Sequence, residues 1–411
     1  MHPPIDPSKQ EPSRAWSVSD GVGQRKAART WLTFLSAGSA IFVGGMLLLP
    51  QEKIIEMLPS TERPQRIIVE ELASGPLVTE PLGIVDTFAN QSEVVFHQLP
   101  TTTSREVITN VAATSARILI VGDIMLDRNV ASRSKAAGTS TYPFQKLPEQ
   151  WFASYDFAVA NLEGPVTAKS LPPVKSIDFR FDPSVVPVLR SQGIDALSQA
   201  NNHALDQGQV GFDDSRKRLR DAGFVVFGHQ VRDDVISMAT TTVNGFRLAL
   251  VGFNTTDNSL DRAAASAALS EARSIADRVI VLPHWGSEYH NKPDSSVVEL
   301  GHWLIDHGAD AVIGGHPHWY QGISVYKNKP IAWSLGNFIF DQDFSVQTNQ
   351  GLAVALTFDQ DKTALEPLPI HIVKSQPSLV DAAAKEKRLE DLAKISDAAL
   401  RDQILRGRVE F

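Results

Sequence analysis

Residues 311–318 of the chain read AVIGGHPH, a short apolar run that ends in two glycines and two histidines. The same order, an apolar run closed by polar groups, occurs at four other places, namely RILIVGD (117–123), FAVANLEG (157–164), ALSQANNH (196–203) and VIVLPHWG (279–286). Short apolar runs bounded by glycine or polar clusters are typical of buried β-strands. The chain is therefore predicted to contain several buried strands with polar side chains at their carboxyl ends.

Helical patterns separate these and further strand candidates. The strand candidates are 117–121, 157–160, 196–198, 224–227, 247–252, 279–282, 311–313, 331–334 and 352–358, and the helical patterns lie near 184–192, 208–222, 259–275 and 294–308. Strands that alternate with helices indicate an α/β protein. The later strands have few helices between them, which predicts a second and more antiparallel sheet.

Open α/β sheets bind ligands in the crevice beyond the carboxyl ends of their strands. The five runs place metal-capable side chains at that edge, namely Asp123, Glu163, Asn202, His203, His284, His316 and His318. Each alone has an ordinary explanation as a turn, a helix cap or a buried histidine. Together they indicate one or two divalent ions, with manganese, iron or zinc suited to these donors. The i, i+2 spacing of His316 and His318 predicts two rings on one face of an extended chain.

Six motifs resemble, in order, those of the CapA family of bacterial poly-γ-glutamate capsule synthesis proteins, within the calcineurin-like metallophosphatase superfamily. They are GDIMLDR (122–128), NLEGPV (161–166), ANNHALDQG (200–208), HWGSEY (284–289), GHPHWYQ (315–321) and SLGNFIFDQ (334–342). The resemblance runs from about residue 117 to 345. It implies a four-layer αββα sandwich of two mixed sheets flanked by helices, and often a membrane anchor.

The resemblance also implies roles for individual residues. The implied metal ligands are Asp123, Glu163, Asn202, His284, His316 and His318, with Glu163 in the place of a carboxylate that bridges two metals. His203 matches a histidine that lies beside the substrate, and Asp206 is placed to orient its ring. Arg128, Lys175 and Arg180 are candidate anion holders for carboxylate or phosphate.

One position departs from the superfamily pattern. The first motif is normally Asp-x-His and here reads Asp123-Ile124-Met125. Because a thioether is a poor ligand for a hard divalent ion, one metal position lacks an imidazole. The number of ions, one or two, stays open. Asn337 and Asp341 match the family pattern, but the sequence yields no role for them.

The N-terminal region carries a membrane signal. Residues 31–50 (WLTFLSAGSAIFVGGMLLLP) hold no charge, and 20 helical residues span the ~30 Å hydrocarbon core of a bilayer. A cleaved signal sequence usually has a shorter apolar core, and a buried helix usually has a polar face, so an uncleaved anchor over residues 30–50 is favoured over both. Arg25, Lys26 and Arg29 precede the run, which predicts a cytoplasmic N-terminus and a periplasmic or extracellular main domain.

The predicted organisation follows from these segments. It comprises a cytoplasmic segment (1–29), the anchor (30–50), a proline-containing stalk (51–115), the metallophosphatase-like domain (116–375) and a helical tail (376–411). The 411 residues have a net charge of -8 and no long basic run, which argues against a nucleic-acid partner. The absence of cysteine excludes disulfides and thiol catalysis.

Three functions fit this pattern. In the first, a metal-dependent hydrolase attacks a phosphoester or a γ-glutamyl polymer, with His203 as proton donor and Arg128 as anion holder. In the second, an anchored accessory protein binds or exports an anionic polymer for a membrane-bound synthase without turnover. In the third, a degenerate fold serves only as a scaffold and binds no metal.

Overall fold

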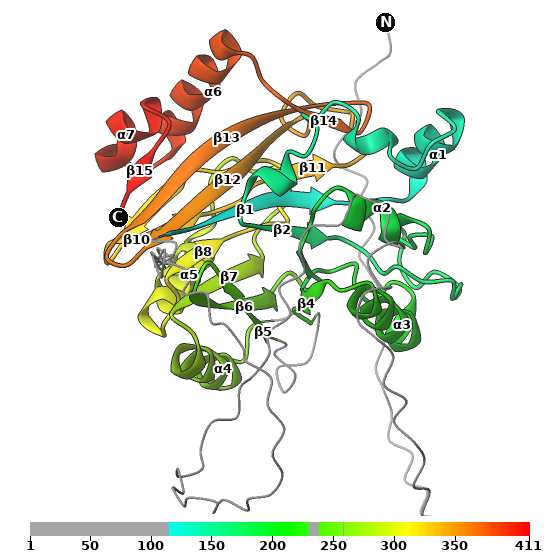
Figure 1. Ribbon diagram of the computed structural model, residues 1–411, viewed down its shortest axis with the longest axis horizontal. Helices are drawn as coiled ribbons and strands as arrows, with labels where there is room; N and C mark the ends of the chain where they lie inside the picture. Colours follow the sequence, from blue (N-terminus) through cyan, green and yellow to red (C-terminus); the bar gives the residue numbers. More distant parts are fainter. Residues whose placement is uncertain (1–114, 230–237, 258) are drawn as a thin grey trace, which may run out of the picture. The chain divides into compact units, whose positions relative to one another are not determined.

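The computed structural model describes residues 115–229, 238–257 and 259–411 (Figure 1). The predicted N-terminal segment, the anchor at 30–50 and the stalk up to residue 114 lie outside the described residues. Among the helices that the structure does describe, none is long and apolar enough to span a bilayer.

Two mixed sheets form the centre of this part of the chain. The first sheet has the order β14-β13-β12-β1-β2-β3-β4, with β11 paired to β1 and β15 paired to β13. Its strands are β1 (Ser115–Ile124), β2 (Phe157–Leu162), β3 (Ala196–Ser198), β4 (Val225–Phe227), β11 (Asn337–Ile339), β12 (Gln350–Asp359), β13 (Thr363–Val373), β14 (Gln376–Leu379) and β15 (Val409–Glu410). Strands β1 to β4 run parallel, whereas β12, β13 and β14 run antiparallel to their neighbours.

The second sheet has the order β5-β6-β7-β8-β10-β9. Its strands are β5 (Met238–Val243), β6 (Phe246–Asn254), β7 (Arg278–His284), β8 (Ala311–Ile313), β9 (Ile323–Tyr326) and β10 (Lys329–Ala332). The four middle strands, β6, β7, β8 and β10, are parallel, and antiparallel hairpins add β5 and β9 at the edges.

Helices connect the strands and cover the sheets. They are α1 (Arg128–Ala136), α2 (Val185–Ser191), α3 (Gly208–Asp221), α4 (Arg262–Ile275), α5 (Ser295–Asp306), α6 (Ala382–Ile395) and α7 (Arg401–Leu405), with 3-10 turns at Tyr142–Phe144, Phe152–Ser154 and Ala398–Leu400. Local sequence explains where several begin. Asp261 caps α4 by accepting hydrogen bonds from the amides of Ala263 and Ala264, and Asp381 caps α6 in the same way.

Strand alternation divides the core into three clusters. Along β1, Ile118 and Ile120 join residues of the second sheet, such as Leu250, in a cluster between the two sheets. Their neighbours Leu119 and Val121 point the other way and pack with residues of α1, α2 and α3. On the far face of the second sheet, a third cluster contains residues of α4 and α5. The described part therefore has four layers: helices, sheet, sheet and helices.

The strand and helix candidates of the central region match observed elements. The predicted placement of the later strands was wrong, because β12, β13 and β14 extend the first sheet instead of forming a second, antiparallel one. Figure 1 shows β12 and β13 beside β1. The reason is long-range pairing: the outer edge of β1 is open after its pairing with β2, and β12 fills it over six residue pairs from Ser115↔Asp359 to Ile120↔Val354.

The C-terminal residues 376–411 contain more than surface helices. They contribute β14 and β15 to the first sheet, and α6 places Leu389 and Leu392 in the cluster between the sheets. Apolar side chains of the tail therefore close one end of the inter-sheet core.

Replacing Leu392 with alanine tests this packing. Leu392 is 1% exposed, so Leu392→Ala should lower the free energy of unfolding by about 2–5 kcal/mol. Leu405→Ala is the matched control, because Leu405 is 40% exposed and its loss should cost much less. Urea unfolding followed by tryptophan fluorescence measures both. Equal midpoints for the two variants would contradict the assignment of the tail to the core.

Candidate metal centre

The predicted metal ligands come together where strands of both sheets end. Asp123 is the second-to-last residue of strand β1, Glu163 directly follows β2, and His284 ends β7. Asn202 and His203 follow β3, and His316 and His318 follow β8. Within each sheet these strands are parallel neighbours, so their carboxyl ends meet at one edge. Six of the seven side chains are buried, namely Asp123, Glu163, His203, His284, His316 and His318.

Close backbone packing fixes Asp123. Its amide donates to the carbonyl of Gly336 at 3.1 Å. A Cβ atom at Gly122 would lie only 2.0 Å from the same carbonyl oxygen, so the glycine before Asp123 is required for the approach of the two segments. The Asn161 amide then donates to Asp123 Oδ1 at 2.8 Å.

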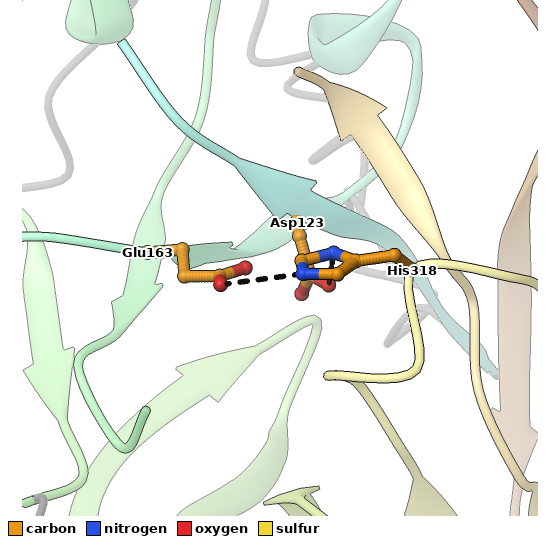
Figure 2. Close-up of side chains that lie close together, drawn as sticks. All are labelled: Asp123, Glu163 and His318. Atoms are coloured by element: carbon orange, nitrogen blue, oxygen red, sulfur yellow. Dashed lines mark ion pairs between the residues drawn. The ribbon is translucent and has the colours of Figure 1, made fainter. Parts of the chain in front are cut away.

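Asp123, Glu163 and His318 form a three-residue group whose ligand atoms lie within 4.8 Å of one another. Figure 2 shows the Glu163 carboxylate directed toward the His318 ring, and the Asp123 side chain overlaps that ring in this view. His318 Nε2 is 4.0 Å from Glu163 Oε1, and Nδ1 is 3.7 Å from Asp123 Oδ2. Carboxylate and imidazole atoms at this spacing fit a divalent cation.

Asn337 orients the imidazole of His318. Its side-chain Oδ1 lies 2.9 Å from His318 Nδ1, while its amide nitrogen donates to the Thr348 carbonyl and to Gln342. Because the amide nitrogen is used elsewhere, the oxygen accepts from Nδ1–H, and the lone pair of His318 is left on Nε2. An orienting partner of this kind is typical of metal-binding histidines. The structure thus gives Asn337 a role that its sequence motif did not.

A second group contains Asn202, His284 and His316. Asn202 Oδ1 is 3.0 Å from His284 Nε2, and the rings of His284 and His316 are 4.9 Å apart. His316 Nδ1 is buried without a hydrogen-bond partner among the described residues. Asn161 joins the two groups, because its amide nitrogen also lies 3.4 Å from His284 Nδ1.

His316 and His318 do not lie on an extended strand. Their φ angles are 96° and 56°, in the left-handed region, and their rings are 6.0 Å apart. The prediction from i, i+2 alternation was therefore wrong about the backbone, because β8 ends at Ile313 and residues 314–318 form a loop. This loop distributes the two imidazoles between the two groups.

Burial controls the protonation of the centre. Burial, followed by the negative charges of Asp123 and Glu288, raises the pKa of Glu163 well above its usual range. Burial raises the pKa of Asp123 to about 6, against the effect of its hydrogen bond from Asn161. For the histidines burial acts the other way: it lowers the pKa of His318 to about 3, that of His316 to about 4 and that of His284 well below its usual value. The imidazoles are therefore neutral at pH 7 and can donate lone pairs.

Glu163 provides the test of whether a cation fits. Both of its carboxylate oxygens are buried, and no N–H or alcohol group of the described residues donates to either; a hydrogen bond with Asp123 requires a proton shared between the two carboxyl groups. A buried anion without a partner is strongly disfavoured, whereas a divalent ion among these neutral imidazoles and carboxylates would compensate it. The donor set therefore fits a divalent metal.

His203 and Asp206 form a hydrogen-bonded pair beside Glu163. Asp206 Oδ2 is 2.7 Å from His203 Nδ1, and it also accepts a hydrogen bond from the Phe179 amide at 2.7 Å. His203 Nε2 faces Glu163 Oε1 at 4.0 Å. The Phe179 ring packs on the His203 ring at 4.1 Å between centroids. The imidazole is thus held with one nitrogen on Asp206 and the other toward the centre.

The predicted anion holders occupy different surroundings. Lys175 Nζ contacts Asp206 Oδ1 and the Asn202 carbonyl, both at 2.6 Å, so the centre's own groups bind it. Arg128 forms a two-point ion pair with Asp341, and its guanidinium lies 5.0 Å from the Phe179 ring centroid. Asp341 therefore positions Arg128, which explains its place in the motif. Arg180 is exposed and lines a cavity of about 560 Å³. Their predicted role in substrate binding stays a prediction.

Glu288 is a residue of the centre that the sequence analysis missed. Its Oε1 lies 3.9 Å from His318 Nε2. The signal was present in HWGSEY, a motif from which only His284 was taken. Met125, in contrast, is fully buried in the cluster on the outer face of the first sheet, where its sulfur accepts from the Asp127 amide. It presents no nitrogen or oxygen ligand to the centre.

Comparison with known proteins identifies the family. The family model described as bacterial capsule synthesis protein PGA_cap matches residues 117–342, more than half of the chain. The chain belongs to this family. The sequence-based resemblance to CapA proteins is thereby confirmed.

The similar curated proteins agree. PGA biosynthesis protein CapA of Bacillus subtilis (strain 168) is 31% identical over 301 residues, which cover 68% of this chain and 78% of that protein. Capsule biosynthesis protein CapA of Bacillus anthracis is 31% identical over 295 residues, 66% of this chain and 71% of that protein. A probable polyglutamine synthesis accessory protein of Mycobacterium tuberculosis (strain ATCC 25618 / H37Rv) is 29% identical over 216 residues, covering 46% of this chain and 56% of its own.

Stabilisation by a divalent cation should increase with pH. Without a cation, the raised pKa of Asp123 (about 6) makes the folded chain bind more protons than the unfolded chain above pH ~4, so this group's contribution falls as pH rises to 6. A cation competes with those protons and needs neutral imidazoles. Manganese should therefore raise the Tm more at pH 7.5 than at pH 5, as differential scanning calorimetry can measure. An equal increase at both values would contradict the assignment of Asp123 and Glu163 to the cation site.

Proposed function

We propose that this protein is a cell-envelope protein of capsule or poly-γ-glutamate biosynthesis whose centre performs metal-dependent hydrolysis or transfer. The proposed substrates are a phosphoester or a γ-glutamyl polymer. The observation that carries the proposal is the buried, donor-free carboxylate of Glu163, which faces His203 on one side and His318 on the other. The family match and the names of the Bacillus relatives support the envelope-polymer context.

The residues of the centre have two proposed roles, cation binding and proton donation. Asp123, Glu163 and His318 would hold one divalent ion, and Asn202, His284 and His316 a second, with manganese, iron or zinc proposed for either position. When bound, such an ion neutralises charge on an anionic substrate and makes water nucleophilic at neutral pH. His203, with Nδ1 on Asp206, carries a proton on Nε2 when it is an imidazolium and can give it to the leaving group.

A cavity beside Phe179 offers space for part of a substrate. Its volume is about 560 Å³, and it is lined by the cations Arg180 and Lys135, by the carboxylates Asp127 and Asp182, and by apolar residues such as Val130 and Phe144. This volume is within the range of small-molecule sites. Arg180 directly follows Phe179, which packs on His203, so one lining residue of the cavity is next in sequence to a residue that contacts the centre. A chain substrate could extend into it from the reacting bond.

The type of four-layer sandwich and the cellular location of the protein are part of the same proposal. The four layers are proposed to be a metallophosphatase-type αββα sandwich, because the ligands lie at the strand ends of two facing sheets. The uncharged run at 30–50 is proposed as a single-pass anchor with a cytoplasmic N-terminus and the centre on the periplasmic or extracellular side. A membrane-bound synthase complex is the proposed partner.

A non-catalytic accessory role is the second candidate. Met125 provides no ligand, so the centre differs from the superfamily pattern at this position, and the charge of Arg128 is already balanced by Asp341. The Mycobacterium tuberculosis relative is named as an accessory protein. In this role the centre would bind an anionic envelope polymer and pass it on or export it without cleaving it.

Glu163→Gln tests the cation site. The substitution keeps shape and removes the charge, so metal content of the purified full chain should fall severalfold or more, and any hydrolysis of phosphoesters or γ-glutamyl polymer should be lost. Glu386→Gln, on the exposed face of α6, is the control and should retain both. Elemental analysis and a hydrolysis screen are the measurements. Unchanged metal content in Glu163→Gln would refute the proposal.

His203→Ala separates the two candidate functions. If His203 donates the proton, kcat should fall by about 10²–10⁴-fold with metal content unchanged, because His203 is not among the proposed ligands. In the accessory role the same variant should leave polymer output of the host cell intact. Asp206→Asn should reproduce part of the kcat loss by releasing the ring. Equal kcat for His203→Ala and wild type would exclude His203 as the acid.

A further inference from the structure

Glu288 lies beside the ring of His318. Its Oε1 is 3.9 Å from His318 Nε2, and Glu163 Oε1 is 4.0 Å from the same nitrogen. The lone pair of His318 is on Nε2, because Nδ1 is bound to Asn337. Two carboxylates from different sheets therefore flank the one ring nitrogen that is free to bind a metal.

These spacings match ligand atoms that share an ion. Bonds of up to ~2.2 Å from oxygen or nitrogen to a divalent metal allow two ligand atoms to be at most about 4.4 Å apart. Both distances to His318 Nε2 fall within that limit. Glu288 is outside the group of Asp123, Glu163 and His318 whose ligand atoms all lie within 4.8 Å of one another, so its partly exposed side chain must turn toward the two other carboxylates to share their ion. The Glu163 carboxylate is fully buried, has no hydrogen-bond donor by geometry and is directed at the same nitrogen. It independently indicates a cation between these side chains.

The segment that carries Glu288 is held in place on the histidine loop. The amide of Trp285 donates to the Gly315 carbonyl at 3.1 Å, and the amide of Tyr289 donates to the Pro317 carbonyl at 2.9 Å. Tyr289 adopts a φ of 62°, a conformation that a bulky residue takes only when its surroundings impose it. Backbone hydrogen bonds thus join residues 285–289 to residues 315–318, and this pairing holds Glu288 beside His318.

Neighbouring groups also orient the Glu288 side chain. It forms a hydrogen bond with Tyr289, whose hydroxyl accepts a second one from Gln342. The Tyr289 ring lies 5.9 Å from the His318 ring. A ligating carboxylate is usually supported by such outer hydrogen bonds.

We propose that Glu288 is a direct metal ligand that completes the position of Asp123, Glu163 and His318. This inference rests on the proposed function only in requiring a cation in the centre. Three carboxylates and one imidazole form an oxygen-rich set, which favours manganese over zinc at this position. Because Glu288 is 41% exposed, it is also the ligand closest to solvent and hence to an arriving substrate.

A manganese titration of the full chain tests the proposal. The electron paramagnetic resonance signal of free Mn²⁺ reports how much of the ion stays unbound. E288Q should weaken Mn²⁺ binding at least ~10-fold, the lower limit for loss of even an outer partner. E288H should recover part of that loss, because it supplies a new ligand atom. E386Q should bind as wild type. The thermal midpoint of metal-free E288Q should stay close to wild type, since the replaced side chain is partly exposed.

The outcomes distinguish this proposal from the broader one. If wild type binds Mn²⁺ and E288Q binds it equally well, Glu288 is not a ligand, while the metal-dependent function stands. If E288H binds no better than E288Q, the ligand role is also overturned. If wild type binds neither Mn²⁺ nor Zn²⁺, both proposals fail together.

Discussion

Burial of the Glu163 carboxyl group beside other carboxylates is the constraint on which the centre depends, because it disfavours the charged form and raises the pKa of this group well above its usual range. A carboxylate taken out of water needs donors or a cation, and no N–H or alcohol group of the described residues donates to Glu163. Asp123 is buried nearby with a raised pKa, while the surrounding imidazoles are held neutral by burial. The polypeptide thus supplies negative charge and lone pairs but no positive charge at this point. That imbalance is the physical reason to place a divalent ion there.

The surrounding framework fixes several side chains of the centre through partners that are not themselves proposed ligands. Asn337 orients His318, Asn161 holds Asp123, and Asp206 holds His203. Asp341 places Arg128 in the same manner. These amide and carboxylate partners come from strand ends and loops of both sheets, so the geometry of the centre is set by how the sheets pack. The arrangement limits how far any one ligand can move and keeps the nitrogen lone pairs directed inward.

The charged side chains around the centre bear on both candidate functions. On one side of the centre, Lys175 is bound to Asp206 and the Asn202 carbonyl, and Arg128 is bound to Asp341. On the other side, Glu288 adds a carboxylate next to His318. Lys175 and Arg128 are therefore paired with carboxylates, and at the cavity Arg180 and Lys135 share the lining with Asp127 and Asp182. Catalysis and polymer binding would both depend on the metal.

The sequence by itself determined the strands of the central region, their polar carboxyl ends and the family, because apolar runs and ordered motifs are local features. Short β3 and β8 were found this way, as were the six ligand candidates. Only the tertiary structure decided what depends on long-range pairing. It placed β12 beside β1 instead of in a separate sheet, put the tail's leucines into the core, and bent residues 314–318 so that His316 and His318 enter different groups. It also brought Glu288 to His318 and Asn337 to the same ring, contacts between residues 19 or more positions apart that no local pattern encodes.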